Sequence, residues 1–148
     1  MLFFLTTGYL FLLTACNSGA QVKNLSVPEF EKAIAQNNVQ LLDVRTAGEY
    51  QSGHLSNAML ANWNNETEFQ ERVKSLDKSK PVYAYCLAGP RSSAATKWLT
   101  QNGFTAYNLS GGIKAWKAAN KPVAEAVAAK QMSMLEYTAQ IPLDKTVL

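Results

Sequence analysis

Short apolar runs alternate along this chain with stretches whose apolar residues recur at helical spacing. The apolar runs predict buried strands at residues 40–44, 58–60, 82–86 and 105–109. Capping patterns at residues 26–29 and 46–49 predict two helix starts, and further helices are predicted at 66–76, 92–101 and 113–119. Strands that alternate with helices in this way predict an α/β fold, with a central parallel sheet and helices on both faces.

The first residues have a different pattern, apolar and without charge over residues 1–13. This run is shorter than the roughly 20 residues that a membrane-spanning helix needs, and it is typical of a secretory signal. The following Leu13-Thr14-Ala15-Cys16 resembles the cleavage box of bacterial lipoproteins. The resemblance implies a signal peptide at 1–15, lipid attached to Cys16, and a lipidated tether at 16–24. The alternative is an ordinary secretory signal that contains a chance cysteine.

A lipid on Cys16 would place the protein in the bacterial cell envelope, facing the periplasm or the exterior. The lipid anchor would then be its only attachment to the membrane. It would also leave Cys86 as the single thiol of the mature chain, because the sequence has two cysteines. An unpaired cysteine in an exported protein is a candidate for reactivity.

The last residues, 122–148, are predicted to form a linker and a segment that resembles the truncated start of a thioredoxin-like domain. The resemblance rests on Ser133-Met134-Leu135-Glu136-Tyr137 and on residues 144–148. It implies that the chain is a fragment of a fusion with such a domain. The alternative is an ordinary amphipathic helix at the end of the chain.

Composition removes several classes of function. The 47% hydrophobic content supports an ordinary globular core in a single domain. The net charge of +3, without a basic cluster, argues against binding to nucleic acid. One histidine and two cysteines are too few for a structural zinc site, so neither a metal nor a cofactor is predicted.

The chemistry of the chain is predicted to lie in the loop that follows residues 82–85. Cys86 ends a strand and precedes a helix, and in parallel sheets sites form at the carboxyl ends of strands. Backbone N–H groups at the start of a helix lower the pKa of a thiol and favour the thiolate. Gly89 permits unusual backbone angles, Pro90 stiffens the approach to the helix, and Arg91 adds a positive charge. The alternative is that Cys86 is a small buried core residue.

Three blocks of the sequence resemble the signatures of rhodanese domains, in order and over residues 25–121. The first contains Leu42-Asp43-Val44-Arg45, Glu49-Tyr50 and Gly53-His54-Leu55. The second is Tyr85-Cys86 with Gly89, Arg91 and Ser92-Ser93, and the third runs from Asn108 to Trp116 through Gly111-Gly112. The resemblance implies a rhodanese-like fold and a sulfurtransferase activity.

In that family the cysteine carries sulfane sulfur as a persulfide and passes it to a thiol acceptor. The resemblance therefore implies that Cys86 is catalytic, that a small sulfur donor is the substrate, and that a thioredoxin-like protein or fused domain is a candidate acceptor. The loop expected to hold the transferred sulfur is formed by Leu87, Ala88, Gly89, Pro90 and Arg91. Asp43 and Arg45, like Glu49, are expected to support the loop and the fold.

Two features of the loop bear on the alternatives. Many active rhodaneses carry arginine directly after the cysteine, whereas this chain has Leu87, which weakens the case for thiosulfate as the donor. Related phosphatases have five residues between cysteine and arginine, whereas four separate Cys86 from Arg91. The shorter loop favours sulfur over phosphate or arsenate. A non-catalytic or regulatory domain that binds a partner is the remaining alternative.

Overall fold

A computed structural model describes residues 21–124, and it contains one five-stranded sheet. The strands are β1 (Lys23–Leu25), β2 (Gln40–Asp43), β3 (Met59–Leu60), β4 (Val82–Tyr85) and β5 (Ala106–Leu109). They lie in the order β1-β5-β4-β2-β3, and every neighbouring pair is parallel. The predicted central parallel sheet is therefore confirmed, and the carboxyl ends of its strands lie along one edge.

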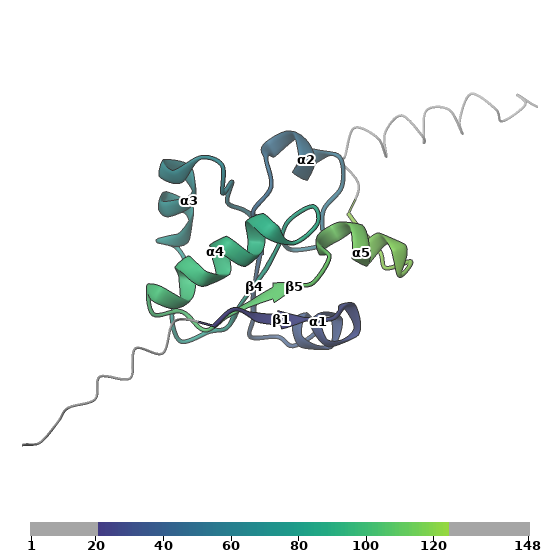
Figure 1. Ribbon diagram of the computed structural model, residues 1–148, viewed down its shortest axis with the longest axis horizontal. Helices are drawn as coiled ribbons and strands as arrows, with labels where there is room; N and C mark the ends of the chain where they lie inside the picture. Colours follow the sequence, from purple (N-terminus) through teal and green to yellow (C-terminus); the bar gives the residue numbers. More distant parts are fainter. Residues whose placement is uncertain (1–20, 125–148) are drawn as a thin grey trace, which may run out of the picture.

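Helices cover both faces of this sheet, as predicted (Figure 1). They are α1 (Val27–Ile34), α2 (Ala47–Gln51), α3 (Glu66–Val73), α4 (Pro90–Gln101) and α5 (Gly112–Ala118). One buried cluster joins α3 and α4 to the sheet through Phe69, Val73, Ala95 and Leu99. A second cluster joins α1 and α5 to the opposite face through Phe30, Ile113 and Trp116.

The central strand β4 is buried over its whole length, and its side chains alternate between the two faces. Val82 and Ala84 pack in the cluster under α3 and α4, whereas Tyr83 and Tyr85 pack in the cluster under α1 and α5. Continuing the alternation brings the next side chain, Cys86, to the α4 face, where it is buried. The position of the thiol therefore follows from the two-residue period of the strand.

One strand was not predicted by the hydrophobic pattern. Lys23 and Asn24 are exposed and Leu25 is half-buried, so β1 has no apolar run of its own. It forms because its backbone pairs with β5 at the edge of the sheet, with Leu25 opposite Leu109. The tether predicted at residues 16–24 therefore needs correction at its end, because Lys23 and Asn24 belong to the sheet.

Two predictions concern residues that the structure does not describe. The signal peptide at 1–15 with the lipidated Cys16 lies outside the described range, and so do residues 125–148 of the predicted linker and thioredoxin-like segment. Within residues 21–124, no helix has the length and apolar character needed to cross a bilayer.

Candidate active site

Cys86 lies directly after β4 in a short loop that leads into α4. Its Sγ accepts a hydrogen bond from the backbone N–H of Gly89 at 3.1 Å. Gly89 has a φ of +117°, which side-chain-bearing residues rarely adopt, and this angle turns the loop back toward the sulfur. Pro90 then starts the helix, at a position where a missing N–H is harmless. The loop thus wraps its backbone around the thiol.

The environment of Cys86 favours the thiolate. Burial is the largest influence and raises the pKa of the thiol, but hydrogen bonds from Ser92, Gly89 and Ala88 together outweigh it and lower the pKa. Both the hydroxyl and the backbone N–H of Ser92 take part. The N-terminus of α4 points these donors at the sulfur, as helix starts do toward anions. These contacts favour the thiolate, which is the nucleophilic form of a cysteine.

The side chain of Ser92 was not predicted to take part. Its hydroxyl donates to the carbonyl of Gly89 at 3.0 Å, and the residue is fully buried. The single proton of this hydroxyl can therefore be donated either to the carbonyl of Gly89 or to the sulfur of Cys86. When the sulfur is a thiolate, it is the stronger acceptor of the two. A hydroxyl in the first turn of the helix that follows the cysteine loop is the signal in the sequence that would have indicated this role.

The start of α5 holds the loop from the other side. The backbone N–H groups of Ile113 and Lys114 donate to the carbonyls of Cys86 and Leu87, at 2.9 and 3.1 Å. In a planar trans peptide the carbonyl and the next N–H point in opposite directions. Fixing these two carbonyls against α5 therefore turns the N–H groups of Leu87 and Ala88 away from it. For Ala88, that direction leads to the sulfur.

This contact requires a glycine at position 112. A Cβ there would collide with the carbonyl oxygen of Cys86 and would lie 2.7 Å from the carbonyl carbon of Leu87. The φ of Gly112 is +57°, which also favours glycine. The Gly111-Gly112 pair was part of the sequence resemblance, but its role in holding the cysteine loop becomes visible only in three dimensions.

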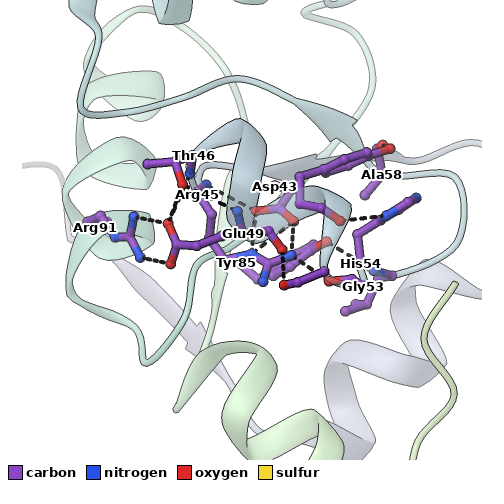
Figure 2. Close-up of polar contacts among 12 residues, drawn as sticks. Asp43, Arg45, Thr46, Glu49, Gly53, His54, Ala58, Tyr85 and Arg91 are labelled. Atoms are coloured by element: carbon purple, nitrogen blue, oxygen red, sulfur yellow. Dashed lines mark hydrogen bonds and ion pairs between the residues drawn. The ribbon is translucent and has the colours of Figure 1, made fainter. Parts of the chain in front are cut away.

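Arg91 is engaged by a carboxylate from another element. Its Nη1 and Nη2 donate to the two oxygens of Glu49 on α2, at 2.8 and 2.6 Å (Figure 2). This bidentate pair, opposed by burial and helped by the N–H and hydroxyl of Thr46, lowers the pKa of Glu49 to about 2. The pKa of Arg91 is raised, first by Glu49 and to a smaller extent by Cys86. Glu49 therefore orients Arg91 at the rim of the loop and offsets its charge.

Asp43 and Arg45 form a separate, fully buried ion pair at the end of β2 (Figure 2). Arg45 Nη2 lies 2.6 Å from Asp43 and also donates to the carbonyl of Gly53 at 2.8 Å. The guanidinium stacks over the ring of Tyr85, 5.6 Å from its centroid. Burial lowers the pKa of Arg45, but the contacts with Asp43 outweigh it and raise the pKa. The pair holds the loop after β2 against β4 and none of its hydrogen bonds involves Cys86, so these contacts are structural.

The other two loop residues present a different surface. Leu87 is 42% exposed, and Ala88 is exposed beside it. The loop thus ends in an apolar tip, whereas its polar backbone is turned inward. Among residues 21–124, no group of three or more His, Cys, Asp or Glu side chains could hold a metal ion.

Comparison with known proteins identifies the family of the chain. The Rhodanese-like domain family matches residues 26–119. A thiosulfate sulfurtransferase, GlpE of Shewanella oneidensis, is 31% identical over 99 residues, which cover 66% of this chain and 95% of that protein. A tRNA uridine(34) hydroxylase of Cytophaga hutchinsonii is 37% identical over 94 residues, 62% of this chain but 30% of the length of that protein.

A solved structure shares the fold. The rhodanese-related protein of Thermoplasma volcanium has a TM-score of 0.62 and 27% identity, and the match covers 69% of this chain and 97% of that one. The family match covers most of the described residues. It includes strands β2 to β5 of the parallel sheet and the cysteine loop between β4 and α4. The chain belongs to the rhodanese-like domain family.

Proposed function

We propose that this protein is a sulfurtransferase that carries sulfane sulfur on Cys86. The Cys86 thiolate attacks the outer sulfur of a donor, an S–S bond forms, and the donor's own S–S bond breaks with its electron pair leaving on the donor. An acceptor thiolate then attacks the outer sulfur of the persulfide and releases Cys86 as a thiolate. Each step exchanges one S–S bond for another, so no external oxidant or reductant is needed.

The observation that carries the proposal is the set of donors directed at one sulfur. Cys86 Sγ accepts from Gly89, and together with Ser92 and Ala88 this lowers the pKa of the thiol despite burial. A thiolate is the form that attacks sulfur. The same backbone N–H groups would stabilise the negative charge of a persulfide one atom further out. The named sulfurtransferase among the relatives, matched over 95% of its length, supports the same chemistry.

The test is the formation of the persulfide. Purified protein incubated with polysulfide, and in parallel with thiosulfate, is expected to gain the mass of one sulfur atom on the peptide that contains Cys86. Cys86→Ser should show no gain on that peptide, while a Ser92→Ala variant should gain sulfur more slowly. If the wild-type protein takes up sulfur from none of these donors, the proposal is wrong and the interaction-domain alternative gains support.

The acceptor in this proposal is a protein dithiol, such as a thioredoxin-like protein. A dithiol attacks the outer sulfur with one thiol and releases sulfide when the second thiol closes the disulfide. If the predicted envelope location holds, such a partner suits a compartment that is poor in small reduced thiols. Loading Cys86 and adding reduced thioredoxin should release one sulfide for each persulfide, and a thioredoxin lacking its second cysteine should retain the sulfur instead.

A further inference from the structure

A cavity of about 270 Å³ lies on the α3 and α4 face of the molecule, apart from the cysteine loop. Its lining consists of Trp63, Glu66, Phe69, Gln70 and Trp98. None of these residues belongs to the loop from Cys86 to Arg91 or to the ion pairs beside it. The volume is just below the range of about 300–1,000 Å³ typical of ligand pockets, so the cavity fits a small head group.

Aromatic rings form most of the cavity. Phe69 is buried, and it meets two half-buried tryptophans edge to face. Its ring centroid lies 4.8 Å from that of Trp63 and 5.4 Å from that of Trp98, with interplanar angles of 86° and 79°. All three rings line the cavity, and Phe69 contacts both indoles. Half-buried indoles keep part of their π surface available to a ligand.

The polar part of the cavity is anionic. Glu66 is its one acidic lining residue, and its carboxylate accepts a hydrogen bond from Gln70 Nε2 at 3.0 Å. Among the described residues, Glu66 takes part in none of the ion pairs. The lining also contains no lysine or arginine that would oppose a cation. The rim of the cavity therefore carries a carboxylate without a cationic partner next to indole rings.

We propose that this cavity binds a small organic cation, of the quaternary or alkylated ammonium class. Indole faces attract such cations through the ring quadrupole, most strongly for tryptophan. The carboxylate of Glu66 adds a direct attraction and fixes the orientation of the charge. An uncharged apolar ligand would gain only contact with the rings. This ligand site goes beyond the proposed sulfur transfer and does not depend on Cys86.

Choline and its uncharged isostere, 3,3-dimethylbutan-1-ol, test the charge requirement directly. Both are titrated into the purified full chain while the three tryptophan indole N–H signals are followed by NMR. Choline is expected to shift the signals of Trp63 and Trp98, and the isostere to bind about tenfold more weakly. Trp116 serves as an internal control, because it packs in the cluster on the other face of the sheet. Its Nε1 donates to the carbonyl of Pro122, away from the cavity.

Two variants separate the carboxylate from a general effect of charge. Glu66 and Glu68 both lie in the first turn of α3, but only Glu66 lines the cavity. Glu66→Gln is expected to weaken choline binding about threefold without affecting the isostere, whereas Glu68→Gln should leave both unchanged. Equal binding of choline and isostere, equal effects of the two variants, or no shift of Trp63 and Trp98 would each overturn the proposal. Persulfide formation on Cys86 is measured separately and should be the same in both variants.

Discussion

Gly112→Ala tests whether the start of α5 holds the cysteine loop in its reactive shape. The added Cβ would collide with the carbonyl of Cys86 and lie 2.7 Å from the carbonyl carbon and oxygen of Leu87. Neither partner can move freely, because both are backbone atoms. We therefore expect the loop and α5 to separate and the hydrogen bonds from Ile113 and Lys114 to be lost or lengthened.

The size of the effect follows from these contacts. A non-glycine residue in the left-handed region costs about 1–2 kcal/mol, and Gly112 has a φ of +57°. The two hydrogen bonds to the loop carbonyls contribute about 1 kcal/mol each. The free energy of unfolding should therefore fall by about 3–4 kcal/mol. Because the N–H of Ala88 is then no longer directed at the sulfur, one of the contacts that lower the pKa of the Cys86 thiol is lost, and this pKa should rise.

Gly103→Ala is the matched control for backbone strain. Its φ is +86°, and the nearest atom to an added Cβ is the flexible end of Lys78, 3.8 Å away. This variant should lose about 1–2 kcal/mol and keep the thiol pKa of the wild type. Urea unfolding measures the stabilities, and the pH dependence of iodoacetamide alkylation of the Cys86 peptide measures the pKa. The reasoning is refuted if Gly112→Ala loses no more stability than Gly103→Ala and alkylates with the wild-type pH profile.

Three further predictions concern the groups around the sulfur. Ser92→Ala removes a hydroxyl that lowers the thiol pKa, so alkylation of Cys86 should require higher pH; an unchanged profile would assign the effect to the backbone alone. The pKa of Glu49 is about 2 in the folded state, below its ordinary value of 4.5. The pair with Arg91 therefore stabilises the fold fully above about pH 5, and this stabilisation is lost as the pH falls toward 2. Glu49→Gln should show less loss of stability over this acid range than the wild type, as measured by urea unfolding, and an equal loss would contradict the assignment. Leu87→Arg should raise kcat/KM for thiosulfate, a dianion, more than for an alkyl persulfide, which carries a single negative charge. Equal changes for both donors in a steady-state assay would argue against a charge effect.

Local features of the sequence were enough to predict four strands of the sheet and the place of Cys86 at the end of one of them. Each predicted strand corresponds to an apolar run, and the alternation in β4 places Cys86 on the α4 face. β1 was missed because its stability comes from backbone pairing with β5, which leaves no hydrophobic signature. A pattern that depends on burial cannot reveal an edge strand whose side chains remain exposed.

The contacts around the loop were less predictable, because they join residues far apart in the chain. Glu49 and Arg91 are 42 positions apart, and although the sequence resemblance implied a role for each, their bidentate pairing became visible only with α2 and α4 in place. Gly112 likewise lies against the carbonyls of Cys86 and Leu87, which are 26 and 25 positions earlier in the chain. The glycine pair in the sequence does not indicate which backbone atoms its missing side chain leaves room for. The sequence predicted where the cysteine loop lies, whereas the contacts that surround the loop required the fold.

The charge balance at the loop has a consequence for the choice of donor. Arg91 is offset by the bidentate carboxylate of Glu49, and Leu87 occupies the position where many rhodaneses carry a second arginine. What remains at the sulfur is a set of dipoles, from the hydroxyl of Ser92 and the backbone N–H groups of Ser92, Gly89 and Ala88. Dipoles at contact distance stabilise one localised negative charge, such as a thiolate or a persulfide, but their field falls off faster with distance than that of a full charge. A dianion such as thiosulfate gains less from them on approach than it would from an unpaired arginine. Sulfur donors of lower charge should therefore be used more efficiently by this site than thiosulfate, and the apolar tip at Leu87 would favour donors or acceptors that bring their own hydrophobic surface.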